Sequence, residues 1–262
     1  MEILDLIFLS FIQGITEFLP VSSSAHLIIL GEYLESEEQD ILFDVSVHLG
    51  TLFAATIYFR KEVEAMLMGF TLKEEHKDGT KLLVNIFVAV CPILLIGFLS
   101  RDLVDLYLRN PLIIAYATII FGVVLYVADK ANSKSNNLNS ISLIQSLVIG
   151  VSQCLALIPG TSRSGITISA ALFLGISREA AAKFSFLLAI PTIGAIAFSE
   201  IIKLNFNQLV VQADKLLLSI LISFFVAYFS IDIFLKILDR IGFTPFVVYR
   251  IVLGLLLILF WI

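Results

Sequence analysis

The sequence predicts an all-α polytopic membrane protein, and its composition and apolar runs carry that prediction. Hydrophobic residues make up 59% of the 262 residues and charged residues only 15%, whereas about a quarter of a soluble domain is charged. The mean hydropathy is +1.00. Several apolar runs approach the roughly 20 residues that a helix needs to cross a hydrocarbon layer of about 30 Å. Because backbone polar groups in lipid must be satisfied within the protein, these runs are expected to be helices.

Six runs have the length and composition of transmembrane helices. They cover about 41–59, 82–99, 111–128, 184–201, 216–235 and 245–262. Two further apolar stretches, 2–30 and 141–175, are each broken near the middle by a proline and a serine-rich turn. Polar turns at membrane depth are tolerated only where they are buried in protein or line a wet cavity. We interpret both stretches as re-entrant helix pairs. The alternative is that each break joins two short spanning helices.

The distribution of basic residues predicts the orientation, because Lys and Arg collect in cytoplasmic loops. With two re-entrant pairs, the loops on one side are 60–81, 129–140, 176–183 and 236–244. These loops hold eleven of the seventeen Lys and Arg residues, whereas the opposite loops hold four. The remaining two, Arg163 and Arg250, lie within membrane segments. Both termini are therefore expected on the outer side.

The chain also repeats itself. Residues 13–24 read QGITEFLPVSSS, and residues 153–164 read QCLALIPGTSRS. Each copy opens a unit of one re-entrant pair and three spanning helices. Since three is odd, the second unit is inverted relative to the first. We therefore expect one transmembrane domain over 1–262, with a first repeat at about 1–128, a cytoplasmic linker at 129–140 and a second repeat at about 141–262. Inverted repeats of this kind place their site near the midplane, where the broken helices meet.

Polar side chains that could bind a substrate or take part in catalysis gather at the two breaks. The first break offers Gln13 and Glu17 on one helix face, followed by Ser22, Ser23, Ser24 and His26; the second offers Thr161, Ser162, Arg163, Ser164, Gly165 and Thr167. Helix N-termini provide N–H groups that bind anions, and a guanidinium suits phosphate oxygens. Ionisable groups inside a membrane are costly unless they are paired or functional. The pattern predicts a phosphate site with an acid/base group.

Each of these residues also has a structural interpretation. The serines can cap helices or bond to the preceding turn, His26 can lie among lipid headgroups, and Glu17 and Arg163 can form an ion pair that only stabilises the fold. Two other polar groups are expected to be structural. Asp44 and His48 lie four residues apart and are expected to pair or to face water. Arg250 needs a partner, for which Asp232 and Glu200 are the candidates.

Two long stretches, 13–26 and 159–169, resemble the signature stretches of the undecaprenyl-pyrophosphate phosphatases, the bacitracin-resistance protein family. Residues 43–51 and 184–191 are also similar to family segments. The resemblance implies hydrolysis of undecaprenyl pyrophosphate to the monophosphate, which recycles the lipid carrier for peptidoglycan synthesis and gives bacitracin resistance. It also implies a divalent cation, Mg²⁺ or Ca²⁺, and a site that opens to the outer side of the inner or plasma membrane.

The resemblance also assigns roles to individual residues. It implies that Glu17, Ser23, His26 and Arg163 are catalytic. Substrate contacts are implied for Ser22, Ser24, Ser162, Ser164, Gly165 and Thr167. Glu17 and Gln13 are the implied cation ligands, although the family's first acidic position is Gln13 here, and a neutral amide binds a hard cation less well than a carboxylate does.

Several alternatives stay open. Either Ser23, activated by His26, attacks phosphorus, or His26 and Glu17 prepare a water molecule. A transporter that moves a polyprenyl phosphate without hydrolysis would need a similar anion site. The expected partners are a polyprenyl pyrophosphate and the bilayer, without nucleic acid, because the chain has no basic patch. The oligomeric state is left open, with a homodimer among the possibilities.

Overall fold

The predicted all-α fold is confirmed. A computed structural model of the chain describes residues 3–23, 25–27, 30, 41–71, 73–108, 110–132, 136–202 and 212–261. These residues form helices joined by turns, with an isolated β-bridge between Asn136 and Ile176. The longer helices are α3 (Ile41–Tyr58), α5 (Lys77–Tyr107), α6 (Pro111–Ala131), α9 (Arg178–Ile201), α11 (Ala213–Ile241) and α12 (Thr244–Trp261).

Shorter helices complete the described part of the chain. They are α1 (Ile3–Thr16), α4 (Arg60–Gly69), α7 (Leu143–Gln153), α8 (Arg163–Phe173) and the single 3₁₀ turns η1 (Glu74–His76), η2 (Leu138–Ser140) and η3 (Cys154–Leu157). Every predicted spanning segment coincides with a helix, but the ends differ. For example, α5 extends well past both ends of the predicted 82–99, because its polar ends continue the helix beyond the apolar run.

The chain is a multi-pass membrane protein. Within the described residues, α5, α6, α9 and α11 are long and apolar enough to cross a membrane. A fifth span is possible if α3 and α4, which are bent by 79° at Phe59, form one crossing. Helix α12 falls among the shorter apolar helices, as do α1 and the α7–η3 segment. The count of six spanning helices therefore stays a prediction.

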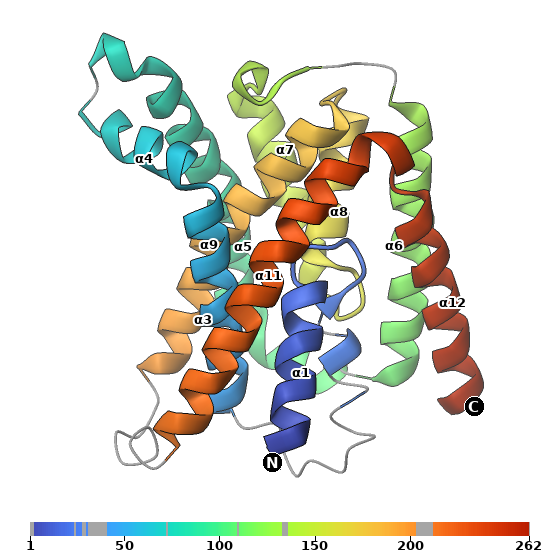
Figure 1. Cartoon of the computed structure of the whole chain (residues 1–262). Coiled ribbons are helices and arrows are strands. Elements are labelled where there is room, and N and C mark those ends of the chain that lie inside the picture. The colour runs from blue at the N-terminus through green and yellow to red at the C-terminus, as the bar shows by residue number, and fades with distance from the viewer. Residues whose placement is uncertain are drawn as a thin grey trace.

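The two broken stretches approach each other from opposite ends of the molecule. Helix α1 runs from the N-terminal end to the middle, and the helical segment that begins at Ser23 turns back toward that same end (Figure 1). Helix α7 enters from the other end, and α8 returns to it (Figure 1). The breaks lie at 17–22 and 158–162, where the prolines and serines are. This arrangement supports the re-entrant interpretation and brings the two serine-rich turns together.

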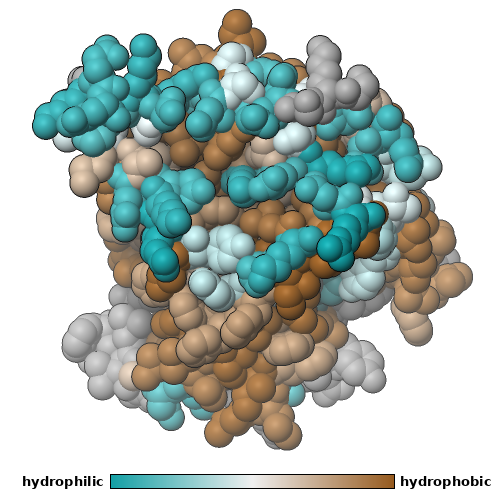
Figure 2. Space-filling model, turned by 45° about the horizontal axis from the view of Figure 1, so that its top comes forward, coloured by the Kyte–Doolittle hydropathy of each residue, from teal (hydrophilic) through white to brown (hydrophobic). Residues whose placement is uncertain are grey.

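The connections sort by charge between the two ends of the molecule. Both termini lie at one end, together with the α5–α6 connection, whereas the connections α3–α4–α5, α6–α7, α8–α9 and α11–α12 lie at the other (Figure 1). The second group contains the Lys- and Arg-rich loops of the sequence. Figure 2 shows hydrophilic residues gathered at this second end and hydrophobic residues along the sides.

Candidate active site

Glu17 lies at the start of the first break, with only 7% of its side chain exposed. The turn after α1 places it one helical turn beyond Gln13, whose carbonyl accepts a hydrogen bond from the Glu17 N–H. Its Oε1 accepts from Arg163 Nη2 at 2.8 Å. Its Oε2 accepts from Gln13 Nε2 at 2.8 Å and from the Ser23 hydroxyl at 2.9 Å. One buried carboxylate therefore connects α1, the first break and the start of α8.

Arg163, the first residue of α8, is held from several directions. Besides its ion pair with Glu17, its Nη1 donates to the carbonyl of Ser185 on α9 at 3.3 Å. The guanidinium lies over the ring of Phe18, 5.7 Å from the ring centre. Phe18 is itself buried and packs edge-on against Phe186. The charged fork is thus fixed in direction but keeps 14% of its side chain exposed, as a phosphate-binding group requires.

Ser22 and Ser162 hold the two turns in a strained backbone conformation. Among the described residues, they are the non-glycine residues with positive φ, at 74° and 69°. They occupy equivalent positions in the two copies of the sequence repeat, and each caps the helix that follows. The Ser22 hydroxyl accepts from the N–H of Ala25, and the Ser162 hydroxyl from that of Gly165. A non-glycine residue in this region costs of order 1–3 kcal/mol and is characteristic of functional turns.

Two side chains join the breaks to each other. The Ser164 hydroxyl donates to the carbonyl of Leu19 at 2.9 Å. Arg250 of α12 is fully buried, and its guanidinium donates to the carbonyls of Pro20, Thr118, Gly160 and Thr161. The sequence suggested a carboxylate partner for Arg250, whereas these partners are backbone carbonyls. Carbonyl groups in a turn lack the backbone N–H donors that they would have inside a helix. A guanidinium with five N–H donors can bond to several of these carbonyls.

His26 is oriented by Ser22 and Tyr249. Its Nδ1 lies 2.7 Å from the Ser22 carbonyl, which can only accept, so we assign the proton to Nδ1. Its Nε2 then accepts from the hydroxyl of Tyr249 on α12, and the two rings stack with centres 5.6 Å apart. The Ser23 hydroxyl donates to Glu17 instead. The expectation that His26 activates Ser23 therefore finds no hydrogen bond between these two side chains in this arrangement.

The remaining predicted contact residues support the site from within. Ser162, Ser164 and Gly165 form the start of α8, and Gly165 lies so close to Arg250 that an added Cβ would be 2.8 Å from Nη1. Thr167 is buried, and its hydroxyl lies 2.7 Å from that of Ser185. Ser24 lies outside the described residues. The structure thus brings most of the predicted residues together, while their contacts with a substrate stay a prediction.

Sequence reasoning missed several neighbours of the site. His48 of α3 lies with its Nε2 3.9 Å from Glu17 Oε2, although it was expected to pair with Asp44 or face water. Its Nδ1 does contact Asp44, but at the carbonyl, 2.7 Å away. Tyr249 gave no signal, because it lies in an apolar helix far along the chain. Ser185 lies in the stretch 184–191, whose similarity to a family segment was its signal. For His48, the similarity of 43–51 to a family segment was the available signal.

The residues proposed to hold a cation fit that role in part. No group of three His, Cys, Asp or Glu side chains that could hold a metal occurs in the part of the chain that the structure describes. Gln13, however, is fully buried, and its amide Oε1 has no hydrogen-bond partner among the described residues. An unpartnered buried oxygen is costly, and a cation shared with Glu17 would satisfy it.

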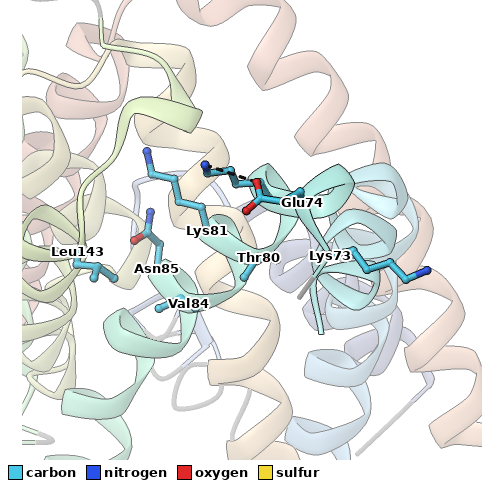
Figure 3. A pocket seen from close by; sticks show the side chains of 8 residues that line it. Lys73, Glu74, Thr80, Lys81, Val84, Asn85 and Leu143 are labelled. Carbon is cyan, nitrogen blue, oxygen red and sulfur yellow. Dashed lines mark ion pairs between the residues drawn. The ribbon is translucent and has the colours of Figure 1, made fainter. Parts of the chain in front are cut away.

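A separate cavity of about 480 Å³ lies at the hydrophilic end, and its lining includes none of the residues above. Lys73, Glu74, Lys81 and Asn85 are among the residues around it (Figure 3). Its charged groups already have partners: Glu74 pairs with Lys77, and Lys81 donates to the carbonyl of Asn139. Lys73 and Lys81 point in opposite directions (Figure 3). The cavity therefore does not provide a convergent anion site.

Comparison with known proteins gives consistent matches over nearly the whole chain. The sequence model of the family described as "Bacitracin resistance protein BacA" matches residues 6–256. Undecaprenyl-diphosphatase 1 of Pseudoalteromonas translucida (strain TAC 125) is 44% identical over 263 residues, which cover 99% of each chain. Undecaprenyl-diphosphatase of Aliivibrio salmonicida (strain LFI1238) is 43% identical over 257 residues, covering 97% of this chain and 96% of the relative.

Proposed function

Because this chain belongs to the bacitracin resistance protein BacA family, we propose that it hydrolyses undecaprenyl diphosphate to undecaprenyl phosphate and phosphate. One observation in the structure carries the proposal. The carboxylate of Glu17 accepts a hydrogen bond from the Ser23 hydroxyl and pairs with Arg163. The proposed base (Glu17), the proposed nucleophile (Ser23) and a guanidinium suited to phosphate (Arg163) therefore lie in contact. Phosphoryl transfer needs little more than positioning and charge stabilisation.

Substrate binding divides between the breaks and the helix surfaces. Arg163 and the N-terminus of α8 would bind the non-bridging oxygens of the terminal phosphate, because both present N–H donors and positive charge. The prenyl tail would lie along the apolar sides of the helices. Such a tail gains about 0.8 kcal/mol for each buried CH₂ group, so the tail supplies affinity and the phosphates supply position.

In the proposed first half-reaction, the Ser23 Oγ attacks the terminal phosphorus as its proton passes to Glu17 Oε2. The bond between phosphorus and the bridging oxygen breaks, and undecaprenyl phosphate leaves with the electron pair. The proton on Glu17 passes to the leaving phosphate, which restores the carboxylate. In the second half-reaction, Glu17 takes a proton from water, whose oxygen attacks the phosphorus of the phosphoserine. The bond between phosphorus and Ser23 Oγ breaks, Glu17 returns its proton to Oγ, and phosphate is released.

A direct attack by water is the second route, and it uses the same carboxylate. Glu17 would then deprotonate the water, and Ser23 would only help to orient it. Under either route, Arg163 stabilises the negative charge on the phosphoryl oxygens. His26 stays a predicted catalytic residue, and Tyr249 fixes the orientation of its ring.

A divalent cation is part of the proposal. By family resemblance it is Mg²⁺ or Ca²⁺, and Glu17 and Gln13 would hold it. When bound, such an ion neutralises negative charge on the phosphate oxygens. The support is that the amide group of Gln13 contacts the carboxylate and that its Oε1 has no hydrogen-bond partner among the described residues.

We also propose that the site opens to the outer side of the plasma membrane and that both termini lie there. The support is the excess of Lys and Arg in the connections at the opposite end of the molecule, which marks that end as cytoplasmic. Two of the partly exposed members of the site, His48 and Ser23, come from segments that begin at or return to the end of the termini (Figure 1).

The experiment uses purified protein in vesicles that contain undecaprenyl diphosphate and an excess of Mg²⁺ or Ca²⁺. Phosphate release that stops on chelation supports the full proposal. If chelation leaves phosphate release unchanged, the proposed phosphatase activity stands and the proposed cation requirement is rejected. If the folded protein releases no phosphate but moves labelled polyprenyl phosphate between leaflets, the phosphatase proposal is rejected in favour of a lipid transporter.

A further inference from the structure

The imidazole of His48 reaches the catalytic carboxylate from α3. Its Nε2 lies 3.9 Å from Glu17 Oε2, which is too far for a hydrogen bond. Its Nδ1 lies 2.7 Å from the Asp44 carbonyl. Because a carbonyl only accepts, Nδ1 is the ring nitrogen that donates here, and Nε2 is the ring nitrogen on the side of Glu17. Histidines that bind metals usually donate their other N–H in this way.

The amide group of Gln13 also contacts the carboxylate of Glu17. Its amide Nε2 lies 2.8 Å from Glu17 Oε2, and its Oε1 has no partner among the described residues. Amide oxygen and nitrogen are assigned from their hydrogen bonds, so a rotation of the amide by half a turn exchanges them. The oxygen would then lie at that 2.8 Å from the carboxylate. Two ligands of an octahedral ion with bonds of about 2.1 Å are separated by a similar distance, about 3 Å.

We propose that Glu17, Gln13 and His48 together form a divalent-cation site, with His48 Nε2 as its nitrogen ligand. This inference rests on the proposed function and deepens it. A single ion can bridge His48 and Glu17 across the observed 3.9 Å, because metal–nitrogen and metal–oxygen bonds are each about 2.0–2.2 Å. The three side chains come from α1, the first break and α3.

The donor set has a consequence for which ion binds. Ca²⁺ and Mg²⁺ prefer oxygen ligands, whereas imidazole suits transition-metal ions. A set of one carboxylate, one amide oxygen and one imidazole therefore favours Mn²⁺ over Ca²⁺ relative to an all-oxygen set. His48 also compensates for Gln13, the position where the resemblance implies an acidic ligand. With 32% of its side chain exposed, against 7% for Glu17, His48 is the more accessible of these two proposed ligands.

Pulsed electron paramagnetic resonance of Mn²⁺ tests the inference without measuring activity. Purified protein in detergent is saturated with Mn²⁺, and the nitrogen coupling of a bound imidazole is recorded. We expect this coupling in the wild type and its loss in His48→Gln. The matched control is His76→Gln, in the hydrophilic loop, which should keep the coupling. Mn²⁺ affinity should fall about tenfold or more in His48→Gln, the size of effect seen for groups that support a metal, while Ca²⁺ affinity changes much less.

The outcomes separate this inference from the proposed function. Coupling that persists in His48→Gln, or that disappears in His26→Gln while His48 is intact, overturns the assignment of His48. Absence of coupling in saturated wild-type protein also overturns it, even if phosphate release depends on a cation. Loss of coupling in His48→Gln supports it, even if the protein releases no phosphate. In that last case the proposed function fails and the cation site stands.

Discussion

At the scale of single residues, Glu17 is the side chain that connects the predicted site residues. Its two carboxylate oxygens accept hydrogen bonds from Gln13, Ser23 and Arg163. Burying a charge in this way is costly unless the charge is paired and hydrogen-bonded. The pairing lets the carboxylate stay ionised, so that it can accept a proton as the proposed base. It also fixes the Ser23 hydroxyl with its proton directed at the base.

The contact between Ser23 and Glu17 leads to a prediction about the intermediate. Rapid mixing with substrate labelled in its terminal phosphate, followed by acid quench, should trap label on the wild-type protein. Ser23→Ala should trap none, and its steady-state rate should fall by at least about a hundredfold, because it loses an activated nucleophile. Wild-type protein that carries no label at any time point would favour direct attack by water.

Tyr249 is predicted to act through His26. Tyr249→Phe keeps the stacked ring but removes the hydroxyl that donates to Nε2. A lost hydrogen bond is worth about 1–1.5 kcal/mol, so we expect kcat to fall about tenfold with little change in KM. The same substitution at exposed Tyr107 is the control and should leave the rate unchanged. An unchanged rate in Tyr249→Phe would show that its hydroxyl has no part in catalysis.

The sequence located most of the candidate site but could not supply its contacts. Glu17 and Arg163 were predicted to meet because the repeat places both breaks at the midplane. The sequence left the partner of Ser23 open, with His26 in one of its two routes, and the structure gives Glu17 as the acceptor of the Ser23 hydroxyl. The direction of a side chain after a turn depends on φ at Ser22, which no pattern reveals. His48 and Tyr249 were not predicted as neighbours, because the rotation of a helix about its axis is fixed by packing with distant segments.

At the scale of elements, the two breaks depend on turns that only a few side chains stabilise. Gly160 has φ of 93° and lies against the backbone of α6, where an added Cβ would be 2.4 Å from the Ile114 carbonyl. Arg250 bonds to carbonyls of both breaks. The position of the breaks was predictable from Pro and Ser. The contact of Arg250 in α12 with both breaks was not predictable, because it joins distant parts of the chain.

The packing of α3 on α11 depends on the absence of a side chain at Gly50. An added Cβ would lie 2.0 Å from Ser223 Oγ and 2.4 Å from the Ile220 carbonyl. Gly50→Ala is expected to destabilise the protein by about 1–3 kcal/mol, as overpacking does, and to lower its thermal midpoint in detergent. Since His48 lies on the same helix, cation affinity should also fall.

Gly97→Ala is the matched control for Gly50→Ala. Its nearest added contact would be ordinary, 3.5 Å from a Leu157 methyl group, and alanine favours a helix by up to about 1 kcal/mol. We expect an unchanged or raised thermal midpoint. Equal losses in the two variants would contradict the close packing of α3 on α11.

For the whole molecule, charge and topology agree. The apolar runs predicted the helices, and the distribution of basic residues predicted that both termini lie on the same side; Figure 1 shows both termini at one end of the molecule. The number of spans could not be settled in the same way. Helices such as α12 are near the length limit, and α3 and α4 are joined by a sharp bend.

The proposed orientation can be tested with single cysteines in a protein whose Cys91 and Cys154 have been replaced by alanine. Asp214 lies in the first turn of α11, near the end of the termini, and Glu75 lies in η1, at the basic end. A membrane-impermeant maleimide added to intact cells should label Asp214→Cys, because that end is expected outside. Glu75→Cys should react only after the cells are permeabilised. The reverse pattern would place the site on the cytoplasmic side.

The rate of phosphate release from undecaprenyl diphosphate by Glu17→Gln tests the central claim most directly. The substitution keeps the size of the side chain but removes the base. With Glu75→Gln as the exposed control and a thermal midpoint to verify folding, we predict a fall of at least about a thousandfold, within the range that general-base catalysis contributes. A folded Glu17→Gln protein that releases phosphate within tenfold of the wild-type rate would contradict the account.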